Sequence, residues 1–94
     1  MKLRVQYMAQ LRTAIGCAEE EVELPEGSSL AALLDHLANL RGHEAAKHLL
    51  TPAGDALHSL LVIVNDSAKP APLARTTLLK SGDTISLLPP IAGG

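Results

Sequence analysis

The sequence predicts an α+β fold in which a mixed sheet of four to five strands packs on one main helix, with a second, short helix beside it. Three observations lead to this prediction. Polar and apolar residues alternate near the amino terminus, leucines recur at helical spacing in the middle, and two apolar runs follow at 60–64 and 84–88. The predicted order is therefore strand, strand, helix, strand, an optional short strand, and a final strand.

Two strands are predicted in the first quarter of the chain. Leu3, Val5 and Tyr7 alternate with polar residues, which is the period of a half-buried strand. After a turn region around Gly16, residues 20–24 alternate again and stop at a Pro-Glu-Gly turn signal. We expect a short connection between these strands, so that they form an opening hairpin.

The main helix is predicted from its cap and its leucines. Ser28 or Ser29 can accept a hydrogen bond from a free backbone N–H at the start of a helix. Five leucines then fall at helical spacing and form one apolar stripe, at Leu30, Leu33, Leu34, Leu37 and Leu40. Gly42 is expected to end this helix, and a shorter helix is expected over residues 44–50.

The second half of the chain supplies the remaining strands. Residues 60–64 form a continuous apolar run, which predicts a strand buried on both faces, near the sheet centre and reached through the helix by a parallel crossover. Residues 65–66 have turn chemistry, and the stretch up to Arg75 is expected to be a surface loop. A tight turn at 81–83 precedes the last predicted strand, 84–88.

Composition restricts the classes of function. The 94 residues suit a single domain, 1–94, with an aliphatic core, since Tyr7 is the only aromatic residue. A net charge of −2 argues against non-specific nucleic-acid binding. The single cysteine, Cys17, excludes an internal disulfide and a four-thiolate cluster. Without a signal peptide or an apolar run long enough to span a bilayer, we expect a cytoplasmic protein with no membrane association.

The last six residues, Pro-Pro-Ile-Ala-Gly-Gly, are expected to form a projecting tail over 89–94. Pro89 and Pro90 cannot donate ladder hydrogen bonds and favour an extended path. Gly93 and Gly94 have no Cβ, so they can pass through a tunnel too narrow for a side chain. Another enzyme could therefore reach the carboxylate of Gly94.

The element order, the Ser-Gly-Asp-Thr-Ile segment before the last strand and the Pro-Pro-Ile-Ala-Gly-Gly ending together resemble the β-grasp, ubiquitin-like sulfur-carrier family. Within it, the chain looks most like the small subunits of molybdopterin synthase. The resemblance covers nearly the whole chain, through residues 7–12, the turn at 64–65 and the tail at 81–94. Two features depart from the family pattern: the segment 66–77 is longer, and residues 87–88 are leucines where many relatives have aromatics.

The resemblance implies a chemistry for Gly94. In this family an E1-like adenylating enzyme uses ATP to convert the terminal carboxylate into an acyl-adenylate. A sulfurtransferase or cysteine desulfurase then supplies the sulfur of a thiocarboxylate. In the molybdopterin branch this group enters the large, catalytic subunit of molybdopterin synthase and donates its sulfur. The chain itself is expected to bind no cofactor and no metal, and the catalytic residues are expected on the partner subunit.

The resemblance also implies a partner surface on the sheet face near the tail. The candidate contacts are Met8, Arg12, Leu88, Pro89, Pro90, Ile91 and Ala92. The alternative interpretation is that Met8 and Leu88 are ordinary core residues and that Arg12 is simply solvated.

Other signals are weaker. His43 and His48 stand five residues apart, so on a helix they diverge instead of sharing the face that a zinc motif needs. Cys17 lies beside the acidic run 19–21, which disfavours a thiolate, and the run itself suits the wet face of a strand.

Three alternatives stay open at this point. The chain could carry sulfur for thiamine, cysteine or tRNA thiolation instead of molybdopterin. It could be a ubiquitin-like modifier joined to lysines through Gly94. It could also be a β-grasp interaction module whose diglycine has no role.

Overall fold

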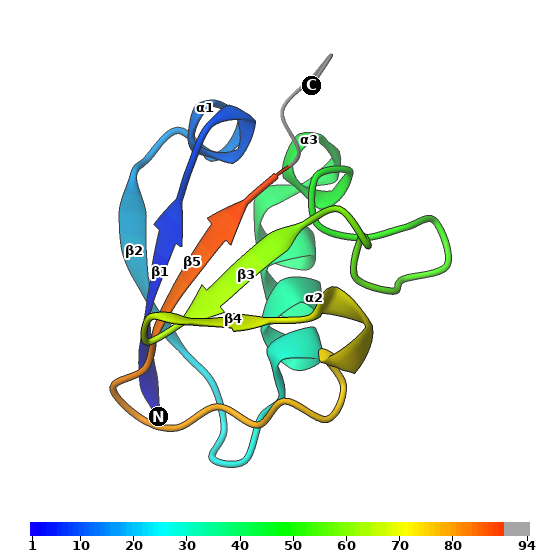
Figure 1. Cartoon of the computed structure of the whole chain (residues 1–94). Coiled ribbons are helices and arrows are strands. Elements are labelled where there is room, and N and C mark those ends of the chain that lie inside the picture. Colours follow the sequence, from blue (N-terminus) through cyan, green and yellow to red (C-terminus); the bar gives the residue numbers. More distant parts are fainter. Residues whose placement is uncertain (90–94) are drawn as a thin grey trace.

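The computed structural model of the chain describes residues 1–89 (Figure 1). The elements of this part are β1 (Lys2–Tyr7), α1 (Gln10–Ile15), β2 (Glu19–Glu23), α2 (Leu30–Arg41), α3 (His43–Ala46), β3 (Leu61–Val64), β4 (Ser67–Lys69), the 3-10 helix η1 (Ala71–Leu73) and β5 (Thr84–Leu88). The α+β prediction is confirmed, with a mixed sheet packed on the main helix α2.

The five strands lie in the order β2-β1-β5-β3-β4. β1 pairs antiparallel with β2 and parallel with β5, while β3 pairs antiparallel with both β5 and β4. β2 and β3 therefore run in the same direction, as a crossover through α2 requires, but β1 and β5 separate them. Residues 60–64 lie near the sheet centre as predicted, because β3 is an interior strand beside the central strand β5.

The connection between β1 and β2 holds a helix, so the prediction of a hairpin with a short turn is wrong in this detail. Leu11 of α1 is completely buried, and this contact fixes the helix on the core. Gly16 ends the helix with a left-handed conformation (φ 92°), and its N–H donates to the Arg12 carbonyl at 2.9 Å. β1 and β2 still pair antiparallel as expected.

The main helix begins as predicted, with the Ser29 side chain accepting a hydrogen bond from the Ala32 N–H at 3.1 Å. Four of the five predicted core leucines are completely buried, namely Leu30, Leu33, Leu34 and Leu37. Leu40 is 57% exposed, because it lies in the last turn, beyond the part of α2 that the sheet covers. The second helix, α3, is shorter than the predicted 44–50 and gives way to turns, although Leu49 remains buried.

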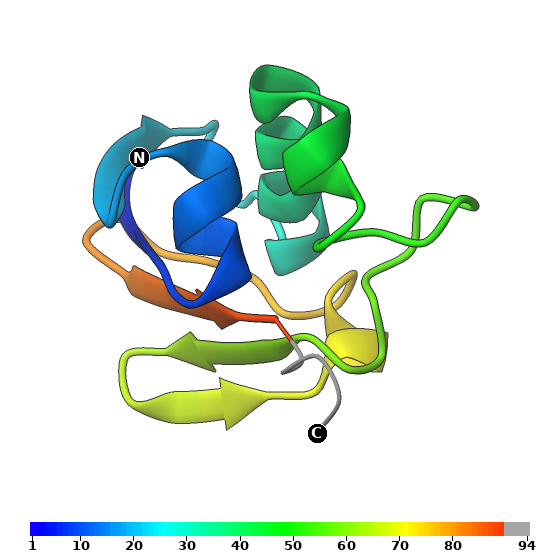
Figure 2. The same cartoon turned by 90° about the horizontal axis from the view of Figure 1, so that it is seen from above.

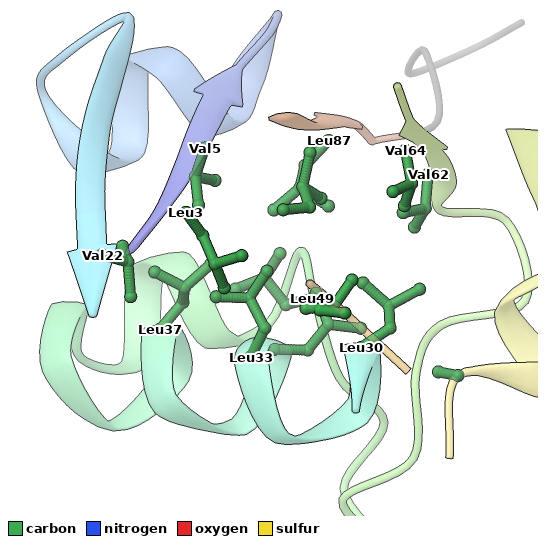
Figure 3. Close-up of a cluster of buried hydrophobic side chains, with 14 of the residues drawn as sticks. Leu3, Val5, Val22, Leu30, Leu33, Leu37, Leu49, Val62, Val64 and Leu87 are labelled. Atoms are coloured by element: carbon green, nitrogen blue, oxygen red, sulfur yellow. The ribbon is translucent and has the colours of Figure 1, made fainter. Parts of the chain in front are cut away.

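The core lies between α2 and the inner face of the sheet (Figure 3). In Figure 3, the side chains of Leu3, Val5, Val62 and Leu87 point from three strands toward the leucines of the helix. The core is aliphatic as predicted, with one aromatic, Tyr7, that is 2% exposed.

Residues 66–75 are only partly the surface loop that was predicted. Asn65 and Asp66 both have positive φ (49° and 72°), as a two-residue type I′ hairpin turn requires. This turn leads into β4, the optional short strand, and then into η1. Ala74 is 3% exposed, and its carbonyl accepts a hydrogen bond from the Ala31 N–H at 3.0 Å, so this segment is fastened to α2.

A polar cluster joins β1, β2 and the end of α2. The Tyr7 hydroxyl donates to a carboxylate oxygen of Glu20, and Arg41 donates to both oxygens of the same carboxylate. Burial, followed by this hydrogen bond and the negative charge of Glu20, raises the pKa of Tyr7 well above its usual value of 10.0. Strand alternation puts Glu20 on the helix side, so the acidic run is not entirely a solvated face.

Candidate partner-binding face beside the tail

The outer face of the sheet is open. Figure 2 shows α1, α2 and α3 together on one side of β5, β3 and β4, which leaves the other side of these strands without a covering helix. Strand alternation places Arg4, Ser86 and Ile63 on this outer face, and each is exposed or half-buried.

Three apolar side chains form a row across the outer face at the end of β5. Leu88 is the cross-strand partner of Leu61 on β3. On the other side, the Met8 N–H donates to the Leu87 carbonyl at 3.1 Å, so the pairing of β1 with β5 continues to Met8. Met8 and Leu61 are 41% and 42% exposed, and Leu88 is half-buried. Ile63 lies in the next row and is half-buried. We call these four residues the outer apolar patch (Met8, Leu61, Ile63, Leu88).

The outer face becomes polar away from this patch. In the next row, the Ser86 hydroxyl donates to the Gln6 side-chain oxygen at 2.9 Å. Beyond it, Arg4 pairs with Glu19 at 3.1 Å, with both side chains about half exposed. The apolar surface is therefore confined to the end of the sheet where β5 stops, which is the end from which the tail leaves.

The candidate contact residues predicted from the sequence are distributed over different surfaces. Met8 and Leu88 lie together in the outer apolar patch. Arg12 is exposed on α1, on the helix side of the sheet, so it does not share the outer face with Leu88. Pro89, which directly follows β5, is fully buried. Binding of a partner by any of these residues remains a prediction.

The remaining tail residues, Pro90, Ile91, Ala92, Gly93 and Gly94, lie outside the described residues, and so does the prediction of a projecting tail. The described chain adds two residues that the sequence reasoning did not assign to the site, Leu61 and Ile63. The apolar run 60–64 was interpreted as buried on both faces, whereas Leu61 and Ile63 face outward while Val62 and Val64 face the core. They are exposed because no helix of the described chain covers this face of the sheet, which the run itself does not reveal.

The histidines and the cysteine that the sequence analysis considered lie outside the outer apolar patch. His43 is exposed at the start of α3, and His48 is half-buried just beyond its end. Among residues 1–89, no three His, Cys, Asp or Glu side chains are grouped as a metal site would require. Cys17 is half-buried and packs against the core. In the same range, no helix has the length and apolar character needed to cross a membrane.

Comparison with known proteins identifies the family to which this fold and tail belong. The sequence model of the ThiS family matches residues 5–94, which is nearly the whole chain. The chain belongs to the ThiS family. Its fold is that of the β-grasp, ubiquitin-like sulfur carriers, so the family resemblance drawn from the sequence is confirmed. A comparison with curated protein sequences gives no match.

Several solved structures are similar over the whole domain. Molybdopterin converting factor subunit 1 of Pyrococcus furiosus is 28% identical, with a TM-score of 0.74 over 97% of this chain and 99% of that one. Small archaeal modifier protein 1 of Methanosarcina acetivorans is 27% identical, with a TM-score of 0.76 over 99% and 96%. A chain of the BexX/CysO complex of Amycolatopsis orientalis is 26% identical, with a TM-score of 0.67 over 98% and 99%. A relative with this fold thus occurs in a protein–protein complex.

Proposed function

We propose that this ThiS-family chain carries sulfur on the carboxylate of Gly94 as the small subunit of molybdopterin synthase. Membership of the family supports the carrier role. The similarity to a molybdopterin converting factor subunit over nearly the full length of both chains supports the pathway.

The proposed reaction begins with an activation step, because a carboxylate is a poor acyl electrophile. An E1-like enzyme transfers AMP from ATP to the Gly94 carboxylate, with release of pyrophosphate. The outer sulfur of a persulfide on a sulfurtransferase or cysteine desulfurase then attacks the acyl carbon, AMP leaves, and an acyl disulfide forms. A second thiol of the partner enzyme cleaves this disulfide, which releases the thiocarboxylate and leaves a disulfide on the partner. The resulting thiocarboxylate donates its sulfur to cyclic pyranopterin monophosphate in the large subunit. This chain supplies the acyl group and a recognition surface, while the nucleotide site and the acid–base groups belong to its partners.

The observation that carries the proposal is the location of the outer apolar patch. β5 ends at Leu88, in the middle of the row that Met8 and Leu61 complete. A partner that covers this row therefore also covers the end of β5, the strand that precedes the last six residues in the sequence. Exposed apolar side chains gathered in one place mark a protein-binding surface more often than isolated ones do.

Intact-mass analysis tests the reaction. The full chain is incubated with ATP, a cognate activating enzyme and a sulfur donor, and we expect replacement of one oxygen by sulfur, assigned to Gly94 by fragmentation. A variant that lacks Gly94 is the control and should stay unmodified. Addition of the large subunit and cyclic pyranopterin monophosphate should then yield molybdopterin. An unmodified wild-type chain with partners of verified activity would disprove the carrier role.

A second candidate function is protein modification through Gly94. The small archaeal modifier protein of Methanosarcina acetivorans is as similar as the molybdopterin factor subunit, 27% against 28%, so identity does not separate the two roles. The modifier role predicts isopeptide bonds between Gly94 and lysines of other proteins, visible as larger species on denaturing gels. Carriers for thiamine, cysteine or tRNA thiolation share the thiocarboxylate and differ in its acceptor. A non-activated module would keep its partner binding without Gly94.

A further inference from the structure

A second surface with exposed apolar side chains lies at the edge of the sheet formed by β4. A groove of about 680 Å³ separates β4 from the segment that returns from η1 toward β5. Figure 1 shows the two segments running alongside each other below β3. We call it the β4 groove, and its principal lining residues are Val64, Ser67, Lys69, Leu73, Leu78 and Lys80.

The distribution of exposed leucines singles out this groove. Five large apolar side chains are exposed within residues 1–89. Met8 and Leu61 belong to the outer apolar patch, and Leu40 stands alone at the end of α2. The remaining two, Leu73 (52% exposed) and Leu78 (65% exposed), both line the β4 groove. Exposed apolar residues are common singly, whereas two in one groove indicate a binding surface.

The wall that carries these leucines is fixed in place. The Thr77 hydroxyl donates to the Leu73 carbonyl at 2.8 Å, and the Thr77 carbonyl accepts from the Leu30 N–H at 2.7 Å. Leu79 is 3% exposed, so its neighbour Leu78 is held on the outside while Leu79 enters the core. The groove is thus preformed, which lowers the entropy lost when a partner binds.

β4 also offers an unpaired strand edge. It is the last strand in the sheet order, and within residues 1–89 no backbone hydrogen bond joins residues 67–69 to anything other than β3. A free edge of this kind can pair with an extended peptide. The opposite edge is different, because four of the five residues of β2 are glutamates. Charged side chains of that kind protect an edge from added strands.

The charges of the groove favour an acidic partner. Lys69 and Lys80 line it, and neither takes part in an ion pair within the described chain. Asp83 also lines the groove, but its carboxylate already accepts hydrogen bonds from the Asn65 side chain at 2.7 Å and from the Lys80 N–H at 2.8 Å. Two ammonium groups are therefore left to attract carboxylates.

We propose that the β4 groove binds an extended segment of a partner protein in which two apolar residues at alternate positions are flanked by acidic residues on the same face, and that this segment adds to β4 as a sixth strand. Alternate side chains of an added strand point to one face, so its apolar residues reach Leu73 and Leu78 on the groove side. No residue that lines the groove belongs to the outer apolar patch, and the inference does not depend on the function proposed for Gly94.

Nuclear magnetic resonance titration of the full chain tests this proposal. The probe is a peptide with blocked ends and the sequence Glu-Thr-Val-Thr-Val-Thr-Glu, which as a strand has both valines and both glutamates on one face. We expect saturable shifts of the backbone amides of residues 67–69, Leu73 and Leu78. Two matched peptides, one with Lys in place of Glu and one N-methylated at alternate residues, should bind at least about tenfold more weakly, which corresponds to about 1.4 kcal/mol.

Variants of the chain distinguish specific binding in the groove from non-specific binding of the peptide elsewhere on the surface. Leu73→Ser combined with Leu78→Ser, and Lys69→Glu combined with Lys80→Glu, should each weaken binding of the acidic peptide at least about tenfold. Leu40→Ser and Lys47→Glu are the controls, since they make the same changes at exposed positions outside the groove, and they should bind as wild type does. The proposal is overturned if the wild-type chain shows no saturable binding, if the lysine peptide binds equally well, or if the shifts centre on the outer apolar patch.

Discussion

The alternation of side chains along the strands gives the sheet two different faces, one buried and one exposed. On the inner face, Leu3, Val5 and Leu87 are at most 1% exposed against the leucines of α2. On the outer face, Met8 and Leu61 keep about two fifths of their surface in contact with solvent. Burial of the inner residues stabilises the fold, whereas the outer residues lose their remaining exposed area only when a second molecule covers them. Stability and recognition are therefore assigned to opposite faces of one layer.

The largest expected effect is on the inner face. Leu33→Ala removes a completely buried side chain from the centre of α2 and leaves a cavity, so we expect the free energy of unfolding to fall by about 2–5 kcal/mol. Urea denaturation followed by circular dichroism measures this loss. Leu40→Ala, on the exposed last turn of the same helix, is the control, with a change within about 0.5 kcal/mol. Similar losses in the two variants would contradict the assignment of the core.

On the outer face, we expect a loss of binding with little loss of stability. Leu61→Asp puts a charge in the outer apolar patch, so the affinity for the proposed partner, the molybdopterin synthase large subunit, should fall at least about tenfold, or about 1.4 kcal/mol. Titration calorimetry measures the affinity, and urea denaturation should show a change of less than about 1 kcal/mol. Leu40→Asp makes the same change at another exposed leucine and should bind normally. Equal affinity of the two variants would remove the patch from the interface.

A third prediction concerns pH and the cluster that ties β1 to α2. The pKa of Tyr7 is raised in the fold, so above pH about 10 the unfolded chain loses this proton while the folded chain keeps it. Tyr7 should therefore stabilise the fold below that pH, and its contribution should decline as the pH rises, by at most about 1.4 kcal/mol per pH unit.

Comparison with Tyr7→Phe separates the contribution of Tyr7 to the pH dependence of stability from the contribution of the lysines. At neutral pH the variant loses one hydrogen bond to Glu20, which still accepts from Arg41, and we expect it to be about 1 kcal/mol less stable. Denaturation at a series of pH values should show the two stability curves converging between about pH 9 and 11. Parallel curves over this range would show that Tyr7 ionises equally in both states.

The smallest effect is expected from the charged part of the outer face. The Arg4–Glu19 pair is about half exposed at both side chains, and exposed pairs of this kind contribute about 0.2–1 kcal/mol. A double-mutant cycle with Arg4→Gln and Glu19→Gln should give a coupling energy in that range, and added salt should reduce it. A coupling energy several times larger would mean that the polar half of this face also stabilises the fold.

Much of the fold could be predicted from the sequence, because the signals are local. The alternation in β1, the Ser29 cap, the leucine stripe of α2 and the turn before β5 each involve neighbouring residues, and each prediction is confirmed. Helix α1 was not predicted, because six residues with a single buried leucine are too few to show a helical period. Leu40 shows that correct spacing does not ensure burial where the covering sheet ends.

The candidate site was harder to predict, because it is assembled from distant parts of the chain. Leu61 lies beside Leu88 through strand pairing, which depends on the order of the strands in the sheet. The sequence pattern does not contain this order. Pro89 was expected at the partner surface, and its side chain is fully buried in the described chain. Membership of the ThiS family supplied what local patterns could not, namely a role for the terminal glycines.

The position of β5 also determines when the domain can fold during synthesis. The third strand of the sheet is the last that the ribosome makes, and it joins β1, near the start of the chain, to β3. Until residues 84–88 have left the exit tunnel, no strand joins the β1–β2 pair to the β3–β4 pair. The nascent chain therefore cannot present a finished surface to its partners before the segment that leads to Gly94 has emerged.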